Sequence, residues 1–194
     1  MKLLEDRIRD QGEIVGDDIV KVDMFLNHLI DIELLCAIGK EFRNLFAGEK
    51  INKILTIEAS GIGIACIAAQ YFNVPVVFAK KGVNRNVGSD IYTGEVFSFT
   101  KNQKTQIGIS KNYLTAEDRV LIIDDFLANG EAVKGLLGIC AQAGAKVEGI
   151  GVCVEKGFQP GGKELRAMGY HVESLAVIDS VKDGVIRFGS YPKK

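Results

Sequence analysis

Short apolar runs alternate with helical segments along most of this chain, and no other feature constrains its fold as strongly. The apolar runs are rich in β-branched residues and predict strands at residues 53–57, 74–79, 120–123, 147–154 and 172–178. Between them, helices are predicted at residues 62–72, 131–143 and 163–168. Strands that are apolar on both faces lie in buried, mostly parallel sheets, because crossover helices cover both faces. The sequence therefore predicts an α/β fold with a mostly parallel central sheet flanked by helices.

Two helices are predicted ahead of this pattern. The first covers residues 1–10 and ends at Gly12. The second is predicted to be capped by Asp31, because apolar residues recur at helical spacing from there to Phe46. No repeat or linker interrupts the 194 residues, so we expect a single domain with these N-terminal helices in about residues 1–50.

A long polar interruption separates the two halves of the pattern, at residues 81–118. Alternating runs at residues 95–100 and 105–110 predict a β-hairpin projecting from the domain, and we expect a flap over about residues 82–110. Between residues 80 and 111 there are six basic and two acidic side chains, which suits a polyanionic ligand. A solvated, lysine-rich loop is the alternative that charge alone leaves open.

The composition argues against several other classes of protein. No apolar run approaches the length of a membrane span, and acids occupy the N-terminal region where a signal peptide needs an apolar core, so we expect a cytoplasmic protein without membrane contact. The first 50 residues hold seven basic and eleven acidic side chains, which disfavours nucleic-acid binding. The four cysteines are far apart among apolar neighbours, and we expect reduced core thiols rather than a metal site.

The segment after the third predicted strand carries the clearest chemical signal. The strand delivers Asp124 and Asp125 to the carboxyl edge of the sheet, where ligands of open α/β folds bind. The small residues Ala128, Asn129 and Gly130 then open a helix, whose N–H groups and dipole favour a phosphate. Acids beside an anion site indicate a ligand that carries hydroxyls as well as phosphate, such as a phosphorylated ribose. An acidic strand end followed by a capped helix remains the alternative.

A second glycine-containing loop joins the first predicted strand to its helix. Gly61 and Gly63 resemble the start of a dinucleotide fingerprint, but Cys66 occupies its third position and the next strand ends in two lysines rather than an acid. A Gly-Ser turn facing a basic strand end is better suited to a pyrophosphate group. Of the two lysines, Lys81 is the stronger candidate, since neighbouring strand residues point to opposite faces.

The acid pair and its small loop resemble the signature of the type I phosphoribosyltransferases, which bind 5-phosphoribosyl 1-pyrophosphate (PRPP). The family often has Thr where this chain has Asn129 and Ala132, which leaves fewer hydroxyl donors for the phosphate. The resemblance implies the type I phosphoribosyltransferase fold, with a flexible hairpin flap and a small N-terminal hood. It also implies that the ribose and 5-phosphate are bound by Asp124, Asp125, Ala128, Asn129, Gly130, Glu131 and Ala132.

The same resemblance assigns the pyrophosphate contacts and the flap residues. Pyrophosphate would be bound by Glu58, Ala59, Ser60, Gly61 and Lys81, with a non-proline cis peptide bond within residues 58–61. The flap would close over the site and exclude water, with Ser98, Thr100 and Lys101 as candidate contacts. Mg²⁺ is expected as a cofactor that binds with PRPP and takes no ligands directly from the protein.

Four segments are similar to the bacterial members of this family that act on xanthine: residues 25–31, 97–101, 124–130 and 155–161. This similarity covers nearly the whole chain and implies xanthine contacts from Val20, Asn27 and Lys156, with Phe158 able to stack on the purine or cover the core. Xanthine has carbonyls at positions 2 and 6, so the Asn27 amide and the Lys156 ammonium can both donate to it. Guanine replaces one carbonyl by an amine, which meets a donor unless the amide flips.

The resemblance therefore implies a Mg-dependent transfer of the phosphoribosyl group from PRPP to xanthine, as part of purine salvage, by a homodimer. Two alternatives stay open. One is a phosphoribosyltransferase for guanine or hypoxanthine, and the other is a non-enzymatic regulator that senses PRPP on the same fold. A receiver domain is disfavoured, because there the acid pair ends the first strand, whereas here two helices and a β-α-β unit precede it.

Overall fold

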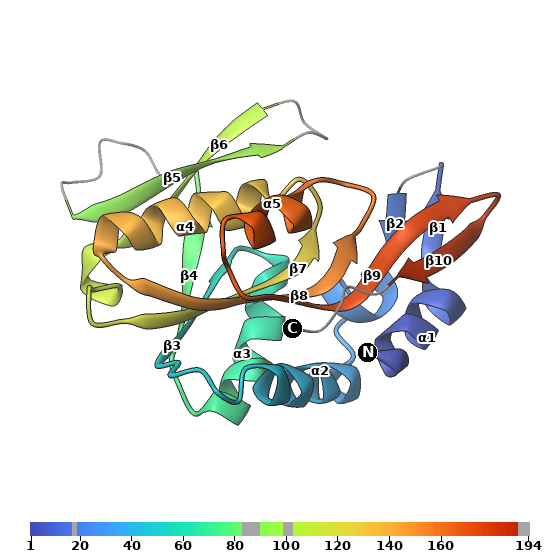
Figure 1. Ribbon diagram of the computed structural model, residues 1–194, viewed down its shortest axis with the longest axis horizontal. Coiled ribbons are helices and arrows are strands. Elements are labelled where there is room, and N and C mark those ends of the chain that lie inside the picture. Colours follow the sequence, from blue (N-terminus) through green and yellow to red (C-terminus); the bar gives the residue numbers. More distant parts are fainter. Residues whose placement is uncertain (17–18, 83–89, 99–102, 190–194) are drawn as a thin grey trace.

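A sheet of eight strands, in the order β10-β9-β8-β7-β3-β4-β6-β5, positions every other element of the protein (Figure 1). The computed structural model describes residues 1–16, 19–82, 90–98 and 103–189. Five neighbouring strands are parallel: β3 (Lys53–Ile57), β4 (Val76–Lys81), β7 (Arg119–Leu127), β8 (Lys146–Lys156) and β9 (Val172–Lys182). Antiparallel strands complete both edges: β10 (Val185–Gly189) on one side, β6 (Gln103–Ser110) and β5 (Ile91–Ser98) on the other. The predicted mostly parallel sheet is confirmed.

Helices cover both faces of this sheet (Figure 1). One face packs against α1 (Lys2–Gln11), α2 (Ile32–Leu45) and α3 (Ser60–Phe72), whose apolar residues form one core with Leu121 and Ile123 of β7. The other face packs against α4 (Glu131–Ala143) and α5 (Gly161–Ala167), which share a second core with Val120 and Ile122. The side chains of β7 thus alternate between two buried cores, which explains its unbroken apolar sequence.

Several predicted elements agree closely with the structure. The strand at 53–57 and the helix at 131–143 have the predicted bounds. Asp31 caps α2 as predicted, since its side chain accepts a hydrogen bond of 3.0 Å from the Leu34 N–H. The third predicted strand, 120–123, was too short, because β7 continues to Leu127. Asp124 and Asp125 therefore lie within a paired strand rather than after its end, and Asp124 is in register with Val152 of β8.

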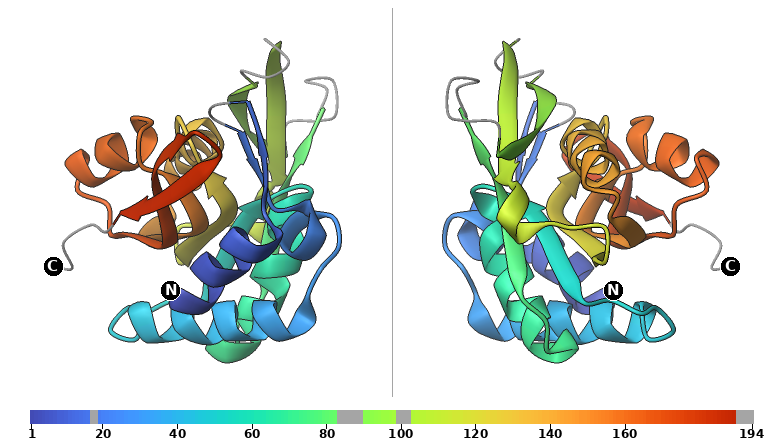
Figure 2. Two further views of the ribbon diagram at one scale, coloured as in Figure 1. Left: turned by 90° about the vertical axis from the view of Figure 1, so that its right-hand side faces the viewer. Right: turned by 90° about the vertical axis from the view of Figure 1, so that its left-hand side faces the viewer.

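The predicted hairpin is present as β5 and β6, but it does not stand free of the domain. It begins at Ile91 rather than at residue 95, and β6 is joined to β4 through the pairs Lys80 with Gly108 and Lys81 with Ile107. A Cβ at Gly94 of β5 would lie 2.7 Å from the carbonyl oxygen of Gly135 in α4, so the strand and helix pack backbone to backbone. Figure 2 shows the hairpin rising from the sheet beyond its helices.

Five short elements were not predicted. They are β1 (Glu13–Val15), β2 (Ile19–Lys21), a π-helix η1 (Asp23–Asn27), a 3-10 helix η2 (Lys111–Tyr113) and the edge strand β10. Each spans three to five residues, which is too short for a periodic pattern to develop. The first three form the small hood between α1 and α2, and η1 positions Asn27.

Two further sequence expectations concern the cysteines and the membrane. All four thiols are free, and Cys140 and Cys153 are buried as predicted, with burial raising the pKa of Cys140 to about 12. The expectation of a core thiol was wrong for Cys66, which is exposed on α3, and Cys36 of α2 is only partly buried. In the described part of the chain, no helix is both long and apolar enough to cross a membrane.

Candidate active site

The acid pair of β7 is held in place by the main chain beside it. One Asp124 carboxyl oxygen, Oδ1, accepts a hydrogen bond of 3.0 Å from the Asp125 N–H, and Asp125 Oδ1 accepts one of 2.9 Å from the Phe126 N–H. Asp124 is only 4% exposed, and its burial, followed by the nearby Asp125 carboxylate, holds its pKa well above the ordinary value. The Lys81 ammonium acts in the opposite direction and lowers the same pKa.

The loop between β3 and α3 reaches the same point. The Glu58–Ala59 peptide bond is cis, which confirms the prediction of a non-proline cis bond within residues 58–61. The Glu58 carboxylate accepts a hydrogen bond from the Lys81 N–H, so the loop is tied to the end of β4. A Cβ at Gly61 would collide with Thr56 Oγ1 and lie 3.3 Å from Asp124 Oδ1. Only glycine therefore lets the first turn of α3 pass so close to Thr56 and Asp124.

The predicted phosphate loop lies between β7 and α4. Gly130 has a φ of +79°, a left-handed conformation that favours glycine, and α4 begins at the next residue. The Gly161 N–H donates a hydrogen bond of 3.1 Å to the Ala128 carbonyl, and a Cβ at Gly161 would collide with that same oxygen. The phosphate loop and the start of α5 therefore support each other through direct main-chain contact.

Lys134 is a supporting residue that the sequence analysis missed. Its ammonium donates a hydrogen bond of 3.1 Å to the Asn129 carbonyl and one of 2.7 Å to the Glu164 carboxylate of α5. The hydrogen bond to Glu164 is the largest of the effects that raise the pKa of Lys134. The signal in the sequence was a lysine one turn after Gly130, which is too common on helices to single out.

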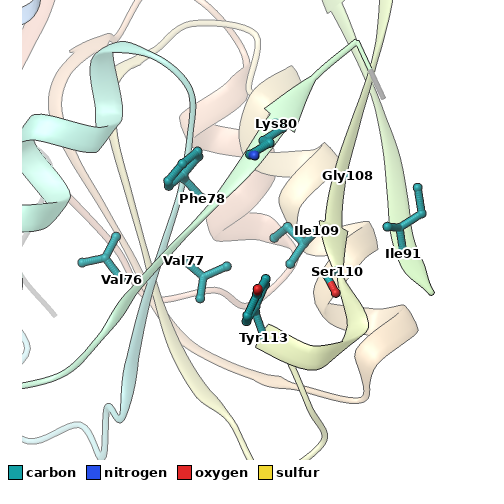
Figure 3. Close-up of a pocket in the computed structure, with 9 residues that line it drawn as sticks. All are labelled: Val76, Val77, Phe78, Lys80, Ile91, Gly108, Ile109, Ser110 and Tyr113. Atoms are coloured by element: carbon teal, nitrogen blue, oxygen red, sulfur yellow. The ribbon is translucent and has the colours of Figure 1, made fainter. Parts of the chain in front are cut away.

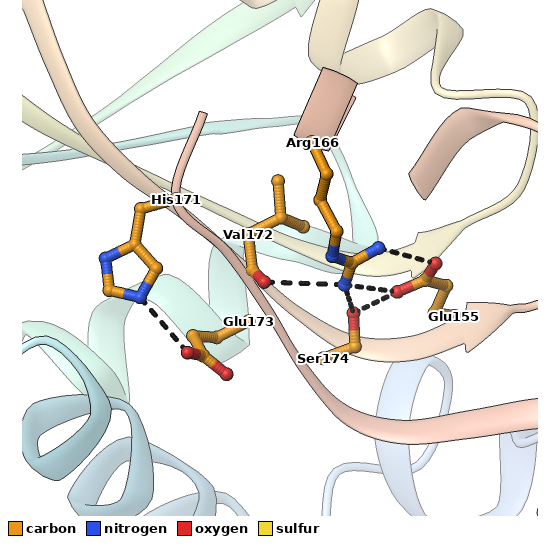
Figure 4. A network of polar contacts seen from close by, with 6 residues as sticks. All are labelled: Glu155, Arg166, His171, Val172, Glu173 and Ser174. Carbon is orange, nitrogen blue, oxygen red and sulfur yellow. Dashed lines mark hydrogen bonds and ion pairs between the residues drawn. The ribbon is translucent and has the colours of Figure 1, made fainter. Parts of the chain in front are cut away.

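A buried ion pair fixes the end of β8, as Figure 4 shows. Glu155 is fully buried, and its two carboxylate oxygens accept hydrogen bonds of 3.0 and 2.9 Å from the Arg166 guanidinium. The Ser174 hydroxyl of β9 also donates to Glu155. Lys156 follows Glu155 directly, and Phe158 lies two residues further on with 43% of its surface exposed. The ion pair therefore anchors the segment that carries both predicted base contacts.

Asn27 joins the N-terminal hood to the acid pair. Its amide nitrogen, Nδ2, donates a hydrogen bond of 3.2 Å to Asp125 Oδ2. Phe25 and Leu26, which precede Asn27 in η1, are fully buried and anchor this helix in the core. Val20 of β2 belongs to the same core cluster and is 5% exposed. The structure thus places a predicted base contact against a predicted ribose contact, although the two are far apart in the sequence.

The remaining predicted residues have different outcomes. Ser98 ends β5, whereas Thr100 and Lys101 lie outside the described residues, so these flap contacts stay predictions. Lys80 lines a pocket of about 480 Å³ between β4 and β6, together with Phe78, Tyr113 and other residues that play no part in the predicted site (Figure 3). This position agrees with the expectation that the side chains of Lys80 and Lys81 point to opposite faces of the sheet.

An acid pair, a glycine loop and a predicted phosphate loop thus meet at the carboxyl edge of a mostly parallel sheet, where open α/β folds bind their ligands. The family model described as the phosphoribosyl transferase domain matches residues 23–168, and the chain belongs to this family. The predicted fold class and resemblance are therefore confirmed.

Several named proteins are similar to this chain over nearly its full length. The chain is 61% identical to a protein of Ruminiclostridium cellulolyticum named xanthine phosphoribosyltransferase, over 97% of this chain and 99% of that one. It is 56% identical to a protein of the same name in Clostridium novyi, with the same coverage of both chains. Among solved structures, the adenine phosphoribosyltransferase of Rhodothermus marinus has a TM-score of 0.74 at 20% identity, covering 92% of this chain and 100% of that chain, which supports the fold.

We predict that the change Arg166→Met destabilises the protein by about 3–5 kcal/mol, because it leaves the Glu155 carboxylate buried without its charged partner. The measurement is the free energy of unfolding in urea. The control is Lys2→Met, which breaks an exposed ion pair with Asp6 and is expected to change stability by less than about 1 kcal/mol. Similar small effects from both changes would contradict the anchoring role of the buried pair.

We predict that Asp124→Asn raises the free energy of unfolding at neutral pH. The pKa of Asp124 is raised in the folded state. Above pH 3.8, its ordinary pKa, the carboxyl ionises more readily in the unfolded chain than in the folded protein, and this lowers the free energy of unfolding. The amide removes this penalty, and the gain is expected to vanish below that pH, where the carboxyl is protonated in both states. Unfolding at several pH values measures it, and a gain independent of pH would refute this explanation.

Proposed function

We propose that the protein transfers the 5-phosphoribosyl group of PRPP to xanthine, giving xanthosine 5′-monophosphate (XMP) and pyrophosphate. The observation that carries this proposal is the hydrogen bond from Asn27 to Asp125, because it joins a candidate base contact to a candidate ribose contact. Relatives that are 52–61% identical over nearly the full length are named xanthine phosphoribosyltransferase, which supports the choice of base.

PRPP binding is proposed to use three adjoining parts of the sheet edge. Asp124 and Asp125 accept hydrogen bonds from the ribose hydroxyls, and the N–H groups at the start of α4 bind the 5-phosphate. The loop at residues 58–61 and Lys81 bind the pyrophosphate. The raised pKa of Asp124 favours its neutral form, which reduces the repulsion expected between the acid pair and a ligand with several negative charges.

The base is proposed to lie between the hood and the end of β8. Asn27 and Lys156 donate hydrogen bonds to the xanthine carbonyls, Phe158 stacks on the ring, and Val20 contributes to the apolar wall. In the reaction, purine N9 forms a bond to ribose C1 as the bond from C1 to pyrophosphate breaks. The ribose becomes positively charged in this step, so the chain contributes mainly by aligning both substrates and stabilising charge.

Mg²⁺ is proposed to bind with PRPP, through the oxygens of the pyrophosphate and the ribose. Such a hard cation prefers oxygen ligands and retains several waters. Both Asp125 oxygens already accept hydrogen bonds from the protein, so the cation is proposed to take its ligands from PRPP and water. When bound, it would neutralise negative charge on the departing pyrophosphate. The homodimer implied by the resemblance stays a prediction.

We predict that xanthine has the highest kcat/KM among xanthine, guanine, hypoxanthine and adenine, because the site offers hydrogen-bond donors to both carbonyls. Product formation with PRPP and Mg²⁺, separated by chromatography, measures this ranking. If another oxopurine leads, PRPP binding stands and the assignment of the base contacts fails. If no purine reacts, the PRPP-sensing regulator becomes the better description.

We predict that Asn27→Asp lowers kcat/KM for xanthine by at least about tenfold, because it replaces a donor by a carboxylate beside Asp125. Steady-state kinetics with varied xanthine measures the effect. Asn112→Asp makes the same chemical change at an exposed position in η2 and serves as the control. Unchanged kinetics in the Asn27 variant would remove this residue from the base site.

A further inference from the structure

We propose that Asp125 determines the choice between a 2-oxo and a 2-amino purine by fixing the orientation of the Asn27 amide. This inference rests on the proposed function, because it requires Asn27 to contact the base. It gives Asp125 a second task besides binding the ribose. Asp125 acts on base choice through Asn27 and is in this respect a positioning residue.

The Asp125 carboxylate is itself oriented by the main chain. The Phe126 N–H donates a hydrogen bond of 2.9 Å to Asp125 Oδ1, which leaves Oδ2 facing Asn27. An ionised carboxylate oxygen accepts hydrogen bonds and cannot donate them. It therefore holds the nitrogen end of the Asn27 amide, at 3.2 Å, and would repel the oxygen end.

The surroundings of Asn27 favour the same orientation. Its position is fixed on both sides, since Phe25 and Leu26 are fully buried and the Leu29 N–H donates to the Asp23 carbonyl. Within the part of the chain that the structure describes, Asn27 Oδ1 is buried without a hydrogen-bond partner. The amide thus turns its oxygen inward and its nitrogen toward the acid pair.

This orientation has a consequence for the base. The amide nitrogen carries two hydrogens, of which Asp125 accepts one, so the second is left to donate to the ligand. The 2-carbonyl of xanthine accepts such a hydrogen bond, whereas the 2-amino group of guanine is a donor and is mismatched. Guanine would be matched only if the amide turned round, and this would set Asn27 Oδ1 against the Asp125 carboxylate.

The test is the variant Asp125→Asn, scored as the ratio of kcat/KM for xanthine to kcat/KM for guanine at one PRPP concentration. The Phe126 N–H would still need an oxygen as its acceptor at the place of Oδ1. The nitrogen of the new amide would therefore take the place of Oδ2 and face Asn27. Asn27 is then expected to turn round and offer its oxygen to the base. The ratio should fall by about tenfold or more. Weaker PRPP binding lowers both values together and leaves the ratio unaffected.

Asp124→Asn is the matched control, because the Asp124 carboxyl bonds to the Asp125 N–H. It is expected to reduce turnover with both purines by the same factor and to leave the ratio unchanged. A second control is Asp125→Asn in an Asn27→Ala background, where the ratio should no longer respond. If a variant is too slow to assay, the dissociation constants of XMP and GMP from isothermal titration calorimetry supply the same ratio.

The outcomes separate this inference from the function on which it rests. A lower ratio in Asp125→Asn alone, lost in the Asn27→Ala background, supports the orienting role. An unchanged ratio, in a protein whose unmodified form prefers xanthine, overturns the inference and leaves the proposed function standing. If the unmodified protein does not prefer xanthine, the proposed function itself fails.

Discussion

The active-site edge is arranged around Asp124, a carboxyl group buried in the central strand β7. Burial and the neighbouring Asp125 carboxylate raise the pKa of Asp124, which favours its neutral form relative to an exposed carboxyl. A buried carboxyl beside a second one suits a ligand that brings hydroxyls and phosphates together. Gly61 approaches Asp124 closely, Asn27 donates a hydrogen bond to Asp125, and the Lys81 charge opposes the rise in the pKa of Asp124.

Long-range contacts, rather than local structure, hold the loops at this edge. Glu155 and Arg166 join β8 to α5, and the start of α5 contacts the phosphate loop through Gly161. Lys134 braces the same loop from α4. The predicted base segment and the predicted phosphate loop therefore share these supports. The rigid parts of the site are therefore a connected unit rather than separate loops.

The sequence was informative where the chemistry is local. The acid pair with its small loop, the glycine turn and the Asp31 cap were all recognisable, because their residues are neighbours in the chain. The pairings between distant residues were not recognisable, since Glu155 pairs with a residue 11 positions away and Asn27 with one 98 positions away. The π-helix that positions Asn27 has no periodic signal, and the extent of β7 depends on its pairing with β8.

The most direct measurement is a crystal structure of the protein with Mg²⁺ and PRPP. The arrangement at this edge predicts the ribose hydroxyls within hydrogen-bond distance of Asp124 and Asp125, with the pyrophosphate on the loop at residues 58–61 beside Lys81. It also predicts the 5-phosphate at the N-terminus of α4, which begins at Glu131. A ribose bound away from the acid pair, or a pyrophosphate that does not contact the glycine loop, would contradict the assignment of this edge as the active site.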